Sequence, residues 1–73
     1  MPDVNYNQLS PTEWDAKRGD IDFHIRLEHD EYAIDVFDAG IEDADAAYLT
    51  THTCDTWEQV ERYCRDYDGV TVV

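Results

Sequence analysis

The chain has 73 residues, of which 18 are Asp or Glu and five are Lys or Arg, so its formal net charge is −13. This length accommodates one domain and excludes a second domain or a dinucleotide-binding unit. The charge excludes direct binding of nucleic acid through phosphate contacts and binding to an anionic membrane, because both need a basic surface. A hydrophobic content of 42% and an aromatic content of 12% favour a folded domain over a disordered chain.

The sequence also predicts where the protein acts. No apolar run approaches the roughly 18 residues that a membrane-spanning helix needs. The first ten residues, MPDVNYNQLS, have neither the basic region nor the apolar region of a secretory signal. Two cysteines are too few for the disulfide scaffold of a small secreted protein. These features predict a cytoplasmic protein.

The N-terminal part of the chain contains one candidate helix. Residues 1–9 have no hydrophobic period and are predicted to form an irregular lead-in to a single domain over residues 10–73. In Ser10-Pro11-Thr12-Glu13, Ser suits the N-cap, Pro the first helical position and Glu the third. The pattern predicts a short helix over residues 11–18, stopped by Gly19 and anchored by Trp14.

A β-hairpin is the strongest local prediction. Residues 20–29 alternate polar and apolar side chains, which is typical of a half-buried strand. A second strand is predicted over residues 32–38. A loop of two or four residues around Asp30-Glu31 keeps the apolar side chains on one face. It pairs Leu27 with Ile34, Ile25 with Val36 and Arg26 with Asp35.

The C-terminal half predicts a third strand, the main helix and a closing strand. Residues 47–53 suit a strand by their Thr and Tyr content. Asp55-Thr56-Trp57-Glu58 predicts the start of a helix that runs to about Tyr67. Residues 70–73 are predicted to form a closing strand. The predicted fold class is α+β in the order α-β-β-β-α-β: an antiparallel sheet of three or four strands, the main helix on one face and a short N-terminal helix.

Cys54 and Cys64 are the first candidates for chemistry. Their predicted positions, before and inside the main helix, separate their Cα atoms by about 13–15 Å. A disulfide requires less than about 7 Å, so both thiols are expected to be reduced. Together with His52 and with His24 or His29 they match no usual zinc-ligand spacing. No metal or other cofactor is predicted.

Paired carboxylates are the second candidates. Asp-x-Asp pairs occur at Asp20/Asp22, Asp43/Asp45 and Asp66/Asp68, but such pairs arise by chance in a chain that is one quarter acidic. No glycine-rich phosphate loop and no nucleophile motif accompanies them. The protein is therefore predicted not to be an enzyme.

The acidic surface itself is the remaining functional signal. Same-face side chains on a strand are about 6.6–6.8 Å apart, close to two phosphate steps of about 3.4 Å along one DNA strand. A sheet that carries carboxylates at this spacing can imitate a phosphate backbone and pair with Arg and Lys. The predicted partner-binding residues are Asp20, Asp22, Glu28 and Asp35 on the hairpin, Asp30 and Glu31 at its tip, and Asp43 and Asp45 as a secondary group.

With its acidic runs Asp20-Ile-Asp22, Glu28-His-Asp-Glu31 and Glu42-Asp-Ala-Asp45, the chain resembles the small phage-encoded inhibitors known as anti-CRISPR and DNA-mimic proteins. The resemblance is to the class and carries over no site residues. It implies a non-enzymatic inhibitor, monomeric or homodimeric, that acts in the host cytoplasm. Such an inhibitor binds a basic nucleic-acid-binding protein, for example a CRISPR effector, and blocks its access to nucleic acid.

Two alternatives remain open from the sequence. The first is a salt-adapted small domain of a halophile without a mimic role, since Asp outnumbers Glu twelve to six and Arg outnumbers Lys four to one. The second is an acidic antitoxin or immunity partner of a basic nuclease. A requirement for high salt in folding would distinguish the salt-adapted domain from the inhibitor and from the antitoxin.

Overall fold

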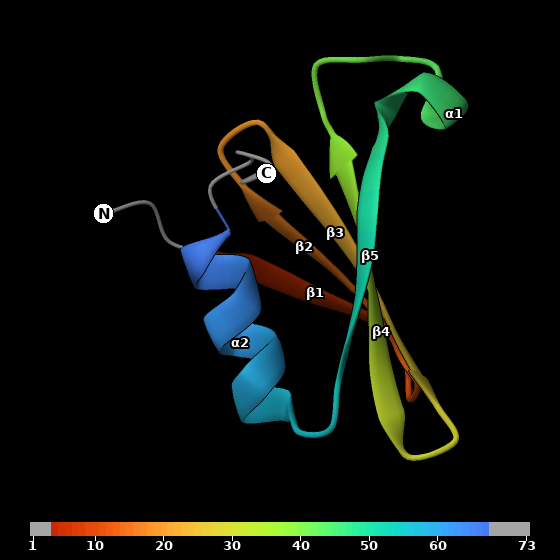
Figure 1. The fold of residues 1–73 in the computed structure, drawn as a ribbon, viewed down its shortest axis with the longest axis vertical. Coiled ribbons are helices and arrows are strands. Elements are labelled where there is room, and N and C mark those ends of the chain that lie inside the picture. Colours follow the sequence, from red (N-terminus) through yellow and green to blue (C-terminus); the bar gives the residue numbers. More distant parts are fainter. Residues whose placement is uncertain (1–3, 68–73) are drawn as a thin grey trace.

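A five-stranded antiparallel sheet dominates the computed structural model, which describes residues 4–67. The strand order is β1-β2-β3-β4-β5, so every strand pairs with its neighbours in sequence (Figure 1). Two helices complete the chain. The elements are β1 (Asn5–Ser10), β2 (Glu13–Arg18), β3 (Ile21–Glu28), β4 (Glu31–Asp38), α1 (Ala44–Ala47), β5 (Tyr48–Cys54) and α2 (Trp57–Asp66).

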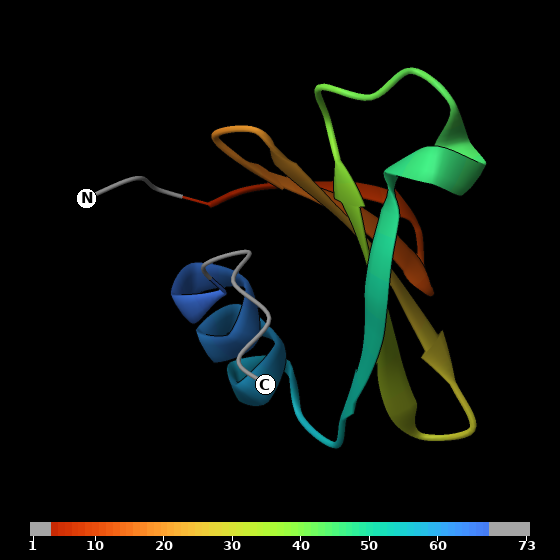
Figure 2. The same ribbon diagram turned by 45° about the horizontal axis from the view of Figure 1, so that its top comes forward.

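Helix α2 packs on one face of the sheet, where it contacts β2, β4 and β5 (Figure 2). The opposite face, which we call the outer face, is not covered by any element of residues 4–67. Strands with one buried face alternate apolar and polar side chains. In β3, accordingly, Phe23 and Ile25 are buried while the intervening His24 lies on the outer face.

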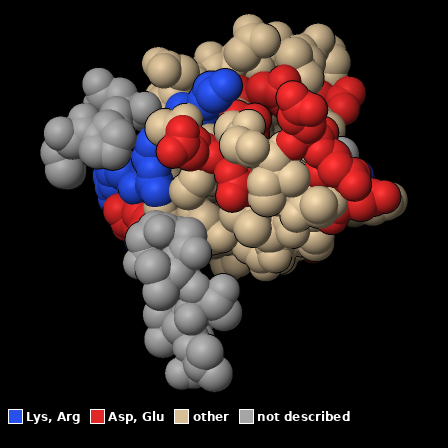
Figure 3. Space-filling model, turned by 90° about the horizontal axis from the view of Figure 1, so that it is seen from above, with Lys and Arg blue, Asp and Glu red and all other residues tan. Residues whose placement is uncertain are grey.

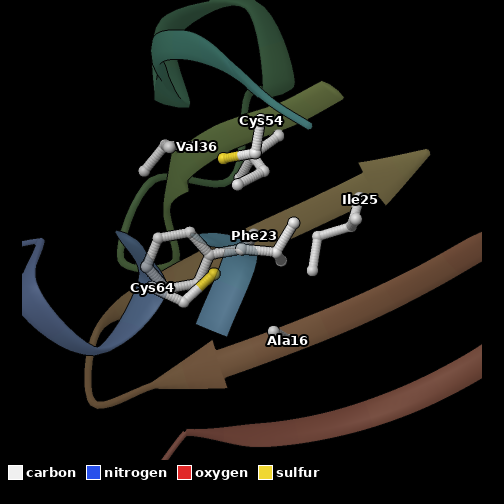
Figure 4. Packing of buried hydrophobic residues seen from close by; sticks show 8 residues of the cluster. Ala16, Phe23, Ile25, Val36, Cys54 and Cys64 are labelled. Carbon is white, nitrogen blue, oxygen red and sulfur yellow. The ribbon is translucent and has the colours of Figure 1, made fainter. Parts of the chain in front are cut away.

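The core lies between α2 and the sheet (Figure 4). Trp57, in the first turn of α2, packs against an aromatic group from three strands, with ring centroids 5.5 Å from Tyr6, 5.0 Å from Trp14 and 5.7 Å from Tyr32. Burial of this apolar surface is the main stabilising contribution. The buried cluster consists of Ala16, Phe23, Ile25, Ile34, Val36, Cys54, Val60 and Cys64.

The predicted N-terminal helix is wrong, because residues 10–18 form the end of β1, a tight turn and strand β2. The Ser10 hydroxyl accepts a hydrogen bond from the backbone N–H of Thr12 at 3.2 Å, so the Ser-Pro pair caps a turn instead of a helix. In β2, Trp14 and Ala16 point to the core with the period of a strand. An isolated eight-residue helix is marginal in water, whereas strand pairing satisfies the same backbone groups on both sides.

The predicted α+β class with three or four strands and the order α-β-β-β-α-β is therefore corrected to a five-stranded sheet in the order β-β-β-β-α-β-α. Where the sequence predicts an irregular lead-in over residues 1–9, the structure has β1 from Asn5 onward. The predicted closing strand over residues 70–73 lies outside the described residues.

The β3–β4 hairpin keeps the predicted apolar face but not the predicted register. Ile25 pairs with Ile34, Phe23 with Val36 and Leu27 with Tyr32. The loop consists of His29 and Asp30, both with positive φ, as in the type I′ turns that fit the twist of a hairpin. Two registers that differ by two residues present the same faces, so the alternation alone does not separate them.

The start of helix α2 lies one residue later than the predicted cap. Thr56 is the N-cap, and its side chain accepts a hydrogen bond from the backbone N–H of Gln59 at 3.2 Å. The Gln59 side chain accepts one in return from the backbone N–H of Asp55 at 2.8 Å. The side chain that completes this reciprocal arrangement is therefore Gln59, where the sequence predicts Glu58.

Candidate partner-binding surface

The hairpin carboxylates on the outer face are paired with cations. Asp22 lies 3.8 Å from the Lys17 ammonium. The Arg26 guanidinium lies 3.0 Å from Glu28 and 3.3 Å from Asp35. Asp35 also accepts a hydrogen bond from the Thr51 hydroxyl at 2.8 Å, and its side chain is only 18% exposed. Asp22, Glu28 and Asp35 of the predicted strip thus have cation partners within the fold, and Asp22 and Glu28 remain exposed at the surface.

The other cations are also engaged. Arg18 donates hydrogen bonds to the carbonyl oxygens of Cys64 and Arg65 at the C-terminus of α2, an arrangement that also suits the helix dipole. Arg62 pairs with Glu58, and Arg65 pairs with Asp66. All five Lys and Arg side chains thus have acceptors within the fold, and the other carboxylates of residues 4–67, apart from Glu13 beside His24, have no cation partner.

Half of the carboxylates in residues 4–67 that have no cation partner lie at one end of the sheet. The turn between β2 and β3 and the connection between β4 and α1 meet there, since the backbone N–H of Ala39 donates to the carbonyl of Asp20 at 2.8 Å. Figure 3 shows this end, with a band of Asp and Glu across it and the Lys and Arg side chains to one side. We call the carboxylates of these two segments and of the adjoining ends of β4 and α1 the acidic rim: Asp20, Asp38, Glu42, Asp43 and Asp45. Within residues 4–67, none of them forms an ion pair.

Local hydrogen bonds order the rim. The Asp38 carboxylate accepts from the backbone N–H of Gly40 at 2.9 Å, and the Asp43 carboxylate accepts from that of Asp45 at 3.1 Å. Both bonds hold a side chain against its own loop, as Asp does in turns. The free oxygens of these carboxylates, with exposed Asp20 and Asp45, remain available to donors from outside the fold.

The eight predicted partner-binding residues thus separate into three groups. Asp22, Glu28 and Asp35 are the cation-paired residues of the outer face. Asp30 and Glu31 are exposed at the hairpin tip, where Glu31 is directly across from Glu28. Asp20, Asp43 and Asp45 lie at the opposite end in the rim, together with two residues that the prediction omits, Asp38 and Glu42.

Exposed apolar side chains adjoin the rim in the chain. Ile41 is 41% exposed, Tyr48 is 47% exposed and Leu49 is 44% exposed. Tyr48 packs against Phe37 with ring centroids 5.8 Å apart. Apolar and aromatic anchors surrounded by polar side chains are typical of protein-binding surfaces. The sequence does not predict these residues as part of a binding surface, because nothing in their pattern distinguishes them from apolar residues of the core.

The cysteines do not form a reactive site. Both are free and buried. Burial raises the pKa of the Cys64 thiol to about 12 and also raises the pKa of Cys54. A thiol needs a lowered pKa to act as a nucleophile near neutral pH, so burial disfavours that chemistry here. Among residues 4–67, no three His, Cys, Asp or Glu side chains are grouped so that they could hold a metal ion.

The outer face has a hollow of about 590 Å³ between the side chains of β1 to β4. Asp15, Lys17, Asp22 and His24 contribute to its lining, so carboxylates and potential cations alternate there. The hollow therefore has a less negative net charge than the rim, whose five residues are all acidic.

Neither helix in the described part of the chain is long and apolar enough to cross a membrane. Comparison with known proteins returns no matching family model, no matching curated protein and no matching solved structure.

Proposed function

We propose that the protein is a small, non-enzymatic inhibitor that binds a basic nucleic-acid-binding surface and blocks its access to DNA or RNA, as anti-CRISPR and DNA-mimic proteins do. The observation that supports the proposal is the acidic rim, five carboxylates without a cation at one end of a small sheet. The partner is a cytoplasmic protein or complex with a Lys- and Arg-rich channel, for example a CRISPR effector.

Competition for the same cations explains the inhibition. The Arg and Lys side chains of the partner pair with rim carboxylates as they pair with phosphates. The two loops that carry the rim are joined to the ends of strands, so the sheet holds them in place with little ordering on binding. Electrostatic steering raises the association rate and weakens as salt is added.

The rim is tested by charge reversal. In the triple variant Asp20→Lys, Asp43→Lys, Asp45→Lys, the net charge becomes −13 + 6 = −7. We expect it to displace labelled DNA from its target about 10- to 100-fold less well, since each reversed pair replaces attraction of about 0.2–1 kcal/mol by repulsion. Fluorescence anisotropy with a panel of purified CRISPR effector complexes and basic nucleases measures the displacement at about 0.15 M salt.

A charge-matched control separates the rim from general acidity. Glu58→Lys, Glu61→Lys, Asp66→Lys gives the same net charge of −7 through three exposed residues of α2. We expect this variant to displace DNA nearly as well as the wild-type protein, with circular dichroism showing both variants folded. Equal losses in the two variants, or no loss in the rim variant, contradict the proposal. Displacement from nucleases alone favours the antitoxin function.

A further inference from the structure

Strand β5 is an edge strand that the fold leaves open. It is the last strand of the sheet, and within residues 4–67 no strand pairs with its outer edge. Its sequence, YLTTHTC, contains no Asp, Glu, Lys, Arg or Pro, and Thr50–Cys54 pair with β4 in unbroken register. An edge of this kind presents a row of free backbone N–H and C=O groups, which proteins usually protect with a charge, a proline or a bulge.

The other edge strand, β1, has such protection. Its pairing with β2 shifts register between Gln8 and Ser10, and Pro11 follows directly. The Gln8 side chain donates a hydrogen bond to the carbonyl of Ser10 at 3.1 Å, which occupies an acceptor of the strand itself. Strand β5 also has a register shift, between its pairs with Val36 and Phe37. Its unbroken stretch Thr50–Cys54 is nevertheless longer than the stretch Asn5–Gln8 of β1 and has no proline next to it, so β5 is the edge better suited to accept another strand.

The charges around β5 select the occupant. From residue 27 to residue 61, which includes β4, α1 and β5, the chain has eleven Asp and Glu and no Lys or Arg. Glu42, Asp43 and Asp45 precede β5, and Asp55 follows it. A second copy of the chain would bring like charges together at this edge, whereas a basic segment would complement them.

Two exposed apolar side chains lie at the start of the same strand. Tyr48 and Leu49 are among the few large hydrophobic side chains exposed in the described residues. An added strand places alternate side chains on each face of the sheet, so its apolar residues can contact Tyr48 or Leu49 while its basic residues reach the carboxylates.

We propose that the outer edge of β5 binds an extended, basic segment of the partner by β-strand addition. Backbone hydrogen bonds to Thr50–Cys54 extend the sheet, and Lys or Arg side chains of the segment pair with Asp43, Asp45 and Asp55. This inference rests on the proposed function, because it takes the partner to be basic. It adds that the partner supplies an extended segment as well as a charged surface.

The probe is a synthetic octapeptide of alternating Lys and Val, acetylated and amidated, which carries four positive charges. Its control is the same peptide N-methylated at two adjacent central residues, which keeps the charge but blocks backbone hydrogen bonding on both of its edges. We expect the control to bind the full-length chain at least tenfold more weakly by calorimetry. We also expect the unmodified peptide to slow amide hydrogen exchange in β5 and not in β1.

The outcomes distinguish this inference from the proposed function. Equal binding of the two peptides, or no binding of either, overturns strand addition and leaves DNA displacement to be judged by the rim variants. Concentration-dependent dimerisation with protected β5 amides in the absence of peptide overturns the inference in favour of a second copy. Binding that is sensitive to N-methylation, without displacement of DNA from any target, supports strand addition and contradicts the inhibitor function.

Discussion

Phe23→Ala is expected to cost about 3–5 kcal/mol of the free energy of unfolding, the usual cost of removing a buried aromatic ring. Phe23 is 1% exposed, lies at the centre of the core and packs edge-on against Tyr67 with ring centroids 5.9 Å apart. Natural domains have about 0.05–0.15 kcal/mol of stability per residue, which gives about 4–11 kcal/mol for a chain of this length. The variant should therefore lose between about a quarter of this stability and all of it, as measured by urea denaturation followed by circular dichroism.

The matched control is Phe37→Ala, the same substitution on the neighbouring strand. Phe37 is half-buried on the outer face, where it packs against Tyr48. We expect a cost of about 1–2 kcal/mol, because much of its surface is already in water and no closed cavity is created. Equal costs for the two variants would contradict a core that lies on one face of the sheet only.

Stability should fall steeply above pH 9. Burial raises the pKa of Cys64 from 9.0 to about 12, so in this interval the unfolded chain loses a proton that the folded protein retains. Because the unfolded state then binds fewer protons, the free energy of unfolding decreases with pH, by about 1.4 kcal/mol per pH unit for one such group. Tyr63, whose pKa burial raises to about 12, adds to the loss above pH 10.

The control for this prediction removes the thiol. Cys64→Ala should lower the stability at pH 8 because it leaves a cavity, but it should reduce the slope between pH 9 and 12. Urea denaturation at several pH values measures both quantities. The same slope in the variant and the wild-type protein would mean that Cys64 does not cause the alkaline loss.

The hairpin and the main helix could be predicted because their signals are local. The alternation over residues 20–29 correctly predicts which side chains of β3 face the core, and the apolar stripe of α2 includes the buried Val60 and Cys64. The N-terminal helix was wrong because Ser10-Pro11 suits a turn as well as a helix start. The alternation of Trp14 and Ala16 is too short to decide without the neighbouring strands.

The composition of the candidate surface depends on tertiary contacts more than on local sequence patterns. Arg26 was predicted opposite Asp35, and in the structure it is opposite Ala33 but still reaches Asp35 diagonally and Glu28 along its own strand. Which carboxylates remain unpaired follows from such contacts and not from charge runs. The rim joins Asp20 to residues 38–45 through one backbone hydrogen bond between segments distant in sequence, which no local pattern indicates.

We propose that the uncompensated carboxylates serve a partner and are not an adaptation to a saline cytosol. Circular dichroism of the purified protein from 0.05 to 3 M KCl tests this role, since salt screens the repulsion between carboxylates that are more than about 10 Å apart at 0.1 M and more than about 3 Å apart at 1 M. If the carboxylates serve a partner, we expect a folded protein with a cooperative thermal transition at the lowest salt concentration. Folding only above about 1 M KCl would assign the acidity to salt adaptation and contradict a partner-binding role.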